Sequence, residues 1–133
     1  MNEGGDPAGP AGVVHRWIAA WSALDAAAVT RLFAPEASYV SGRDGELDRL
    51  PRRFALAART WAAVEIDDVS IDEPLTADGL SVVAGRYRFS GVDRRGRRVA
   101  YSGALTFVLR RDGEVGDGAW RIVRFHESVL PSR

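Results

Sequence analysis

The chain has 133 residues, enough for one domain with a buried core, and its 46% hydrophobic and 27% charged residues are typical of a globular protein. The 18 basic and 18 acidic residues balance, which argues against electrostatic capture of nucleic acid or of an anionic membrane. There is no Cys, and the 18 basic residues are all Arg, so disulfides, thiolate nucleophiles, Cys-bound zinc and Schiff-base lysines are excluded.

The first twelve residues are rich in Gly and Pro and contain neither a basic segment nor an apolar one. This composition predicts a flexible tail over residues 1–12 rather than a signal peptide. No apolar run in the sequence approaches the roughly 20 residues that span a bilayer. We therefore expect a cytoplasmic protein with one domain over residues 13–131 and no membrane contact.

Two helices are predicted at the start of this domain. Trp17 and Trp21 belong to an apolar stripe at helical spacing that includes Val14, Ile18 and Leu24. Asp25 is a suitable N-cap for a second helix, which we expect to run through Phe33 and to stop before Pro35.

A short strand and a third helix follow. Residues 37–41 alternate in polarity, which predicts a strand. The third helix is expected to begin near Asp48 and to accept Pro51 in its first turn. Its buried stripe is predicted to include Phe54 and Trp61.

The second half of the chain is rich in strand-forming residues. Four predicted strands cover residues 64–72, 80–92, 98–111 and 119–130. They are separated by short turns at residues 78–79, 93–96 and 112–118. Short connections between long strands favour an antiparallel sheet, and the helices must cover one of its faces. The expected fold class is therefore α+β, with three N-terminal helices packed on a curved, mainly antiparallel sheet.

Apolar residues occupy both faces of the last two predicted strands. Leu105 and Phe107, for example, alternate with Ala104 and Val108. Since helices cover only one face, the other face needs a partner. We therefore expect a homodimer that forms through the sheet.

Several local phrases carry a resemblance to a known superfamily. They are His15-Arg-Trp-Ile-Ala-Ala-Trp21, Leu32-Phe-Ala-Pro-Glu-Ala-Ser-Tyr39, Arg110-Arg-Asp-Gly113 and Trp120-Arg-Ile-Val-Arg-Phe-His-Glu-Ser128. In these phrases the chain resembles the nuclear transport factor 2-like superfamily over about residues 13–131. That superfamily includes ketosteroid isomerases, SnoaL-like polyketide cyclases and the association domain of calcium/calmodulin-dependent kinases. The resemblance implies a cone-shaped fold with an internal pocket.

The catalytic residues of the best-known enzyme branches are absent from the matching positions. Where ketosteroid isomerases have a Tyr, an Asp and a second acid, the matching positions here are Trp17, Ser41 and about Phe107. SnoaL-like cyclases carry an Asp where this chain has Leu105-Thr106-Phe107. The resemblance therefore implies a fold and leaves the reaction open.

Strand alternation and the resemblance together predict which residues face the pocket. The strand residues assigned to it are Val83, Tyr87, Phe89, Leu105, Phe107, Val123, Phe125 and Glu127, with Tyr39 and Ser41 from the first strand and Trp17 and Trp61 from the helices. The result is an aromatic site with few polar groups, which is the usual composition of a small-molecule site.

Glu127 and Tyr87 are the candidate catalytic residues. Burial in an apolar cavity favours the neutral form of a carboxyl group, which makes Glu127 a candidate general acid or base. The alternative is a carboxylate at the rim, paired with an Arg or located at a dimer seam. Tyr87 and Tyr39 are candidate donors to a ligand carbonyl, or simply phenols at the edge of the core.

The two histidines do not predict a metal site. His126 alternates with Glu127 and is expected on the opposite face, together with Arg124 and Ile122. His15 lies on the first helix and is expected to be solvated. No metal and no cofactor is therefore expected.

Two hypotheses remain open. The first is a small enzyme that needs no cofactor and isomerises or cyclises a hydrophobic small molecule by acid/base catalysis, in bacterial secondary metabolism. The second is a non-catalytic module for small-molecule binding or dimerisation.

Overall fold

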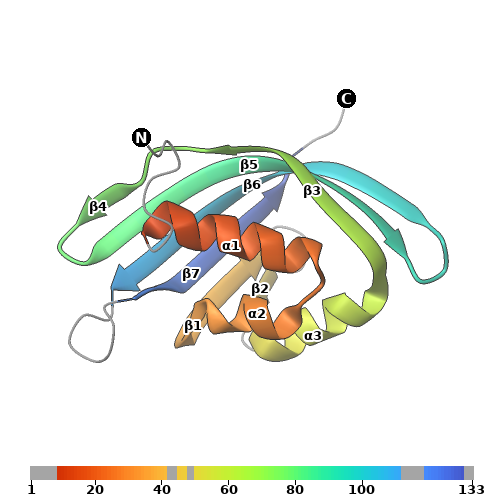
Figure 1. Cartoon of the computed structure of the whole chain (residues 1–133), viewed down its shortest axis with the longest axis horizontal. Helices are drawn as coiled ribbons and strands as arrows, with labels where there is room; N and C mark the ends of the chain where they lie inside the picture. The colour runs from red at the N-terminus through yellow and green to blue at the C-terminus, as the bar shows by residue number, and fades with distance from the viewer. Residues whose placement is uncertain (1–8, 42–44, 48–49, 112–118, 131–133) are drawn as a thin grey trace.

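Helices gather on one side of a strongly curved sheet (Figure 1). The computed structural model describes residues 9–41, 45–47, 50–111 and 119–130. The helices of these residues are α1 (Pro10–Ser22), α2 (Ala26–Arg31) and α3 (Leu50–Thr60). The α+β architecture expected from the sequence, with helices in the first half and strands in the second, is confirmed. No helix of the described residues is long and apolar enough to cross a membrane.

The strands of the described residues form one sheet in the order β2-β1-β7-β6-β5-β3, and β4 pairs with β5 beyond the end of β3. Their bounds are β1 (Phe33–Ser41), β2 (Gly45–Leu47), β3 (Trp61–Ile71), β4 (Leu75–Ala77), β5 (Leu80–Asp93), β6 (Arg98–Arg111) and β7 (Trp120–Val129). All pairs are antiparallel except β1 with β7, which run parallel. The sequence did not predict β2 or β4 as separate strands.

Helix α1 begins at Pro10, so its first turn includes residues 10–12, which the sequence assigned to the tail. Pro suits this position because its missing N–H group would have no partner in the first helical turn. Gly12, Val13, Val14 and Trp17 are buried, and they attach the helix to the sheet.

Helix α2 starts where the sequence predicted. The Asp25 side chain accepts a hydrogen bond from the backbone N–H of Ala28 at 3.1 Å, which is an N-cap interaction. The predicted continuation of this helix through Phe33 is wrong. Phe33 is the first residue of β1 and pairs with Ile122 of β7, whose N–H donates to the Leu32 carbonyl at 2.9 Å. An apolar residue suits a helix face and a strand equally well, so periodicity alone did not separate the two.

Helix α3 ends one residue before the sequence predicted, and Trp61 begins β3 instead of closing the helical stripe. Arg94, in the turn between β5 and β6, provides partners for the end of the helix. Its Nε donates to the Arg59 carbonyl at 2.8 Å, and its backbone N–H donates to the Thr60 carbonyl at 3.2 Å. These bonds satisfy carbonyls that a helix C-terminus otherwise leaves without a donor.

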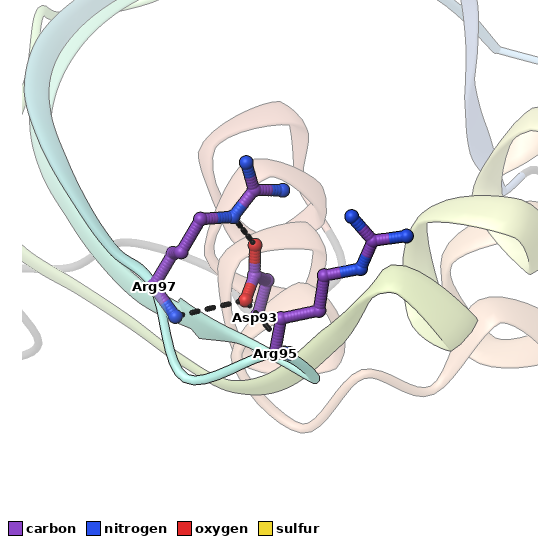
Figure 2. A network of polar contacts seen from close by, with 3 residues as sticks. All are labelled: Asp93, Arg95 and Arg97. Carbon is purple, nitrogen blue, oxygen red and sulfur yellow. Dashed lines mark hydrogen bonds and ion pairs between the residues drawn. The ribbon is translucent and has the colours of Figure 1, made fainter.

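The turn between β5 and β6 is organised around one carboxylate (Figure 2). Asp93 Oδ1 accepts from the backbone N–H groups of Arg95 and Arg97, both at 2.9 Å, and Oδ2 accepts from Arg97 Nε at 2.8 Å. These bonds, above all the one from the Arg97 N–H, lower the pKa of Asp93. Gly96 has a φ of 83°, which is the left-handed conformation that favours glycine. The turn predicted at residues 93–96 is present, and its arginines are exposed.

The predicted turn at residues 78–79 is also present. Asp78 and Gly79 have φ values of 52° and 79°, as a two-residue turn between twisted strands requires. The predicted turn at residues 112–118 and residues 1–8 of the predicted tail lie outside the described residues.

Candidate functional site

The sheet has an inner face, which the helices cover, and an outer face. On the inner face of β5, β6 and β7, the side chains of Val83, Tyr87, Phe89, Leu105, Phe107 and Phe125 are each at most 3% exposed. The pairing of β5 with β6 runs from Leu80 to Val92 without a shift in register, so strand alternation predicted their orientation correctly.

Alternation failed on β7. The register shifts between Val108, which pairs with Arg124, and Leu109, which pairs with Ile122. Val123 is therefore the extra residue of a β-bulge, and Ile122 is fully buried in its place. The predicted inward position of Val123 is wrong, and so is the predicted position of Ile122 beside His126 on the outer face. A bulge changes which residues share a face, and a single sequence gives no signal for it.

Trp17 of α1 rests on the aromatic residues of the inner face. Its ring centroid lies 5.5 Å from that of Phe107 and 5.2 Å from that of Phe125. The two Phe rings stack on each other at 4.7 Å. Such pairs stabilise a core beyond the area that they bury. Trp17 therefore packs on the inner face, and its predicted contact with a ligand stays a prediction.

The indole Nε1 of Trp17 is buried and has no hydrogen-bond partner in the described part of the chain. A buried donor without an acceptor is costly, and most native structures avoid it. Trp17 therefore carries a buried N–H group that has no acceptor among the described residues.

The phenol of Tyr87 donates a hydrogen bond to the Glu127 carboxylate at Oε2. Tyr87 is 3% exposed and Glu127 is half-buried, and they belong to strands that are not neighbours, since β6 lies between β5 and β7. The two residues that the sequence selected as catalytic candidates are thus in contact. Their contact across a strand was not predicted.

Gly103 explains how the phenol crosses β6. It pairs directly with Tyr87 in the sheet register. A Cβ atom at this position would lie 2.4 Å from the Tyr87 ring, which is far closer than non-bonded atoms tolerate. The missing side chain of Gly103 therefore leaves the space through which Tyr87 reaches Glu127.

The pKa of Tyr87 is raised above its ordinary value. Burial is the main cause, and the negative charge and hydrogen bond of Glu127 add to it, followed by Tyr101. Because the phenol keeps its proton, it is a permanent donor to the carboxylate at physiological pH.

Tyr101 belongs to the same cluster and was missed in the sequence. Its ring centroid lies 6.2 Å from that of Tyr87. Its ring also stacks on that of Phe89, with the two centroids 4.8 Å apart. The signal was present, because Tyr101 precedes Leu105 by four residues on one strand and therefore shares its face.

Trp61 and the first-strand candidates lie at the borders of this cluster. The half-buried Trp61 ring lies 5.1 Å from that of Phe89. In β1 the backbone of Tyr39 pairs with Phe125, and that of Ser41 pairs with Glu127. The side chains of Tyr39 and Ser41 lie outside the described residues, so their predicted contact with a ligand stays a prediction.

The histidines lie apart from the cluster. His15 and His126 are both exposed. Within the described ranges, no group of three or more His, Asp and Glu side chains is placed to hold a metal ion.

Comparisons with known proteins identify relatives by sequence and by fold. The sequence profile of the SnoaL-like domain matches residues 14–117. No curated protein matches the chain.

Among solved structures, a nuclear transport factor 2-like superfamily protein from Salmonella enterica serovar Typhimurium is similar with a TM-score of 0.73 and 19% identity, over 91% of this chain and 88% of that one. A ketosteroid isomerase-like protein from Erwinia carotovora atroseptica has a TM-score of 0.74 and 15% identity, over 91% and 93%. A candidate calcium/calmodulin-dependent protein kinase II association domain from Xanthomonas campestris has a TM-score of 0.71 and 23% identity, over 92% of this chain and 86% of that one. At these identities the likeness concerns the fold.

Proposed function

The chain belongs to the SnoaL-like domain family, within the nuclear transport factor 2-like superfamily, and we propose that it is an enzyme acting on a hydrophobic small molecule by acid/base catalysis without a cofactor. The observation that carries this proposal is the Glu127 carboxylate, held by the buried phenol of Tyr87 on an otherwise aromatic inner face. The expected reaction is a proton-transfer isomerisation or cyclisation. A cytoplasmic place in bacterial secondary metabolism is part of this proposal and rests on the resemblance to SnoaL-like cyclases.

In the proposed mechanism, Glu127 transfers the proton and Tyr87 orients the Glu127 carboxylate. A proton leaves a carbon next to a carbonyl group of the substrate for a Glu127 oxygen, while the C–H electron pair forms an enolate. The same carboxyl group then returns the proton to another carbon, so an isomerisation needs no co-reactant. The Tyr87 bond to Oε2 limits rotation of the carboxylate during both steps.

Trp17 supports a substrate that carries an acceptor oxygen. Its indole N–H is buried without a partner, beside Phe107 and Phe125 on the same face as Glu127. A carbonyl oxygen of the ligand that accepts from this N–H would satisfy the donor and stabilise the enolate oxygen. The substrate class is therefore a ketone or related carbonyl compound with an apolar body.

The test is proton exchange at carbon in a panel of steroid-like and polyketide-like ketones, measured in D2O by mass spectrometry. Wild-type protein should exchange the hydrogen next to the carbonyl, and Glu127→Gln should lose about a hundredfold or more of this rate. Glu65→Gln, which changes an exposed carboxylate on β3, is the matched control and should keep the rate.

One observation favours the alternative of a non-catalytic binding module. Tyr87 and Glu127 satisfy each other, as residues of a purely structural pair do. If ketones bind to the wild-type protein but none of them exchanges its hydrogen faster than with Glu127→Gln, the protein is a non-catalytic binding module. If no compound of the panel binds, both proposals are wrong.

A homodimer through the outer face is the proposed assembly. Val82 is 39% exposed, and in the sheet register it pairs with the half-buried Val108, which in turn pairs with Arg124. This face is thus partly apolar, and no helix of the described residues covers it, which supports a second copy as its cover. Light scattering should give twice the chain mass, and Val108→Arg should give a monomer. A monomeric wild type at micromolar concentration would contradict this assembly.

A further inference from the structure

A second concave site lies at the other end of β7 from Glu127. Residues of α1, α2 and the start of β7 line a groove of about 450 Å³. Trp120, which lines the groove, and Glu127 are seven residues apart on one strand, and that separation corresponds to about 23 Å. The groove is therefore distinct from the Tyr87–Glu127 contact.

Positive charge from three separate elements converges on this groove. Arg16 comes from α1, Arg31 from the last turn of α2 and Arg121 from β7, and the lining residues that the structure describes include no Asp or Glu. Arg16 and Arg31 are exposed, and Arg121 Nη1 donates to the Arg31 carbonyl at 3.4 Å. Like charges that gather in a concave surface raise the local concentration of anions. A guanidinium also pairs with carboxylate, sulfonate and phosphate groups in a two-bond geometry.

The rest of the lining is apolar. It includes the small side chains of Ala20 and Ala28, together with Leu32. The half-buried Trp120 ring also borders the groove, and the Arg111 guanidinium lies 5.8 Å from its centroid. Small side chains beside an aromatic ring leave space for a planar group. The groove thus combines a place for a negative charge with a place for a ring.

From this combination we propose that the groove, called here the arginine groove and defined by Arg16, Arg31, Arg121 and Trp120, binds a small organic anion with an aromatic body. The acidic group pairs with Arg16 and Arg31, and the ring lies against Trp120 and the alanines. A neutral compound with the same ring system lacks the ionic part of the interaction and binds more weakly.

Two fluorescent probes that differ by one group test this proposal. 8-Anilinonaphthalene-1-sulfonate carries the charge, and N-phenyl-1-naphthylamine has the same rings without it. We expect saturable binding of the sulfonate to the wild-type protein, weaker binding of the neutral probe, and a loss of sulfonate affinity as salt concentration rises.

The double variant Arg16→Gln/Arg31→Gln should raise the dissociation constant of the sulfonate about tenfold and leave that of the neutral probe unchanged. Arg86→Gln/Arg88→Gln, two exposed positions on the outer face of β5, is the matched control and should have no effect. Circular dichroism verifies that all variants are folded.

Three outcomes would overturn the proposal. One is the absence of saturable sulfonate binding to the wild-type protein. Another is an equal loss of affinity in the double variant and in its control. The last is a loss of sulfonate affinity in Trp17→Phe or Glu127→Gln but not in the double variant, since that result places the probe on the inner face.

Discussion

The charged side chains at the two ends of β7 lie in opposite kinds of surroundings. At the Glu127 end, one carboxylate is held by a phenol that is almost fully buried, among aromatic rings. At the Trp120 end, the exposed Arg16 and Arg31 and the half-buried Arg121 line a groove, and none of its described lining residues is a carboxylate. The first arrangement suits chemistry on a neutral, apolar molecule, and the second suits recognition of an anion. Under the two proposals, one strand carries two sites of different selectivity.

The turn between β5 and β6 provides a useful reference for the groove. There the arginines also cluster, but Asp93 supplies the anion from within the chain. Where arginines gather around an internal carboxylate, their role is structural. At the arginine groove the described lining residues include no Asp or Glu, and the proposed anion would pair with Arg16 and Arg31.

The largest effect should follow from closing the space beneath Tyr87. Gly103→Ala places a Cβ atom against the phenol ring, and we expect a loss of about 2–3 kcal/mol in the free energy of unfolding. Urea denaturation measures it. The same substitution in a Tyr87→Ala background should cost much less, because the ring is gone. Equal losses of unfolding free energy in both backgrounds would mean that the ring and Gly103 are not in contact. As a control, sulfonate binding in the arginine groove should not change in either background.

A smaller effect is expected from Trp17→Phe, which removes the indole N–H but keeps an aromatic ring. Affinity for ketone ligands should fall about fivefold to tenfold, because a hydrogen bond to the carbonyl is lost. Affinity for hydrocarbons of the same shape should change little. The measurement is calorimetric titration with both ligand types. If both lose affinity equally, Trp17 contributes packing and no hydrogen bond.

Alkaline pH should expose the energetic cost of ionising Tyr87. Its pKa is raised in the folded protein, so the phenol keeps its proton to a higher pH than in the unfolded chain. The resulting stability is complete below pH about 10, the ordinary value for Tyr, and is lost as the pH rises above it. Tyr87→Phe should therefore show a flatter loss of thermal stability between pH 9 and pH about 11. Parallel curves for the two proteins would contradict the buried position of the phenol.

The smallest effect is expected on the acidic side, at Asp93. Its pKa is lowered in the folded protein, so the stability that it provides is present above pH about 4 and is lost as the pH falls below that value. Asp93→Asn should be slightly less stable than the wild type at pH 7, and the gap should close in acid. Thermal melting across this range tests it, and a gap independent of pH would assign the effect to packing.

How much of the molecule was predictable depends on the regularity of each segment. The inner face of β5 and β6 followed from alternation because their register is unbroken. Alternation failed at Val123 because a bulge adds one residue, and the helix boundary failed at Phe33 because its apolar side chain fits either element. The family and the Asp25 cap were also correctly inferred from local phrases.

The candidate site was predictable only in part. Tyr87 and Glu127 were chosen from their faces, but their hydrogen bond depends on Gly103, which is 16 residues from one and 24 from the other along the chain. The unpartnered N–H of Trp17 depends on every neighbour in three dimensions and has no signature in sequence. The residues of the arginine groove come from three separate segments of the chain, so no local sequence pattern predicts it.

The contact of Arg94 with the end of α3 has a consequence for how the protein varies. Arg94 binds the carbonyls of Arg59 and Thr60, and the next residue is Trp61, whose ring packs on Phe89. The position of an exposed loop is thereby linked to the orientation of an indole in the aromatic cluster. Under the proposed function, a substitution at the solvent-facing Arg94 would therefore change ligand selectivity without altering a residue of the aromatic cluster.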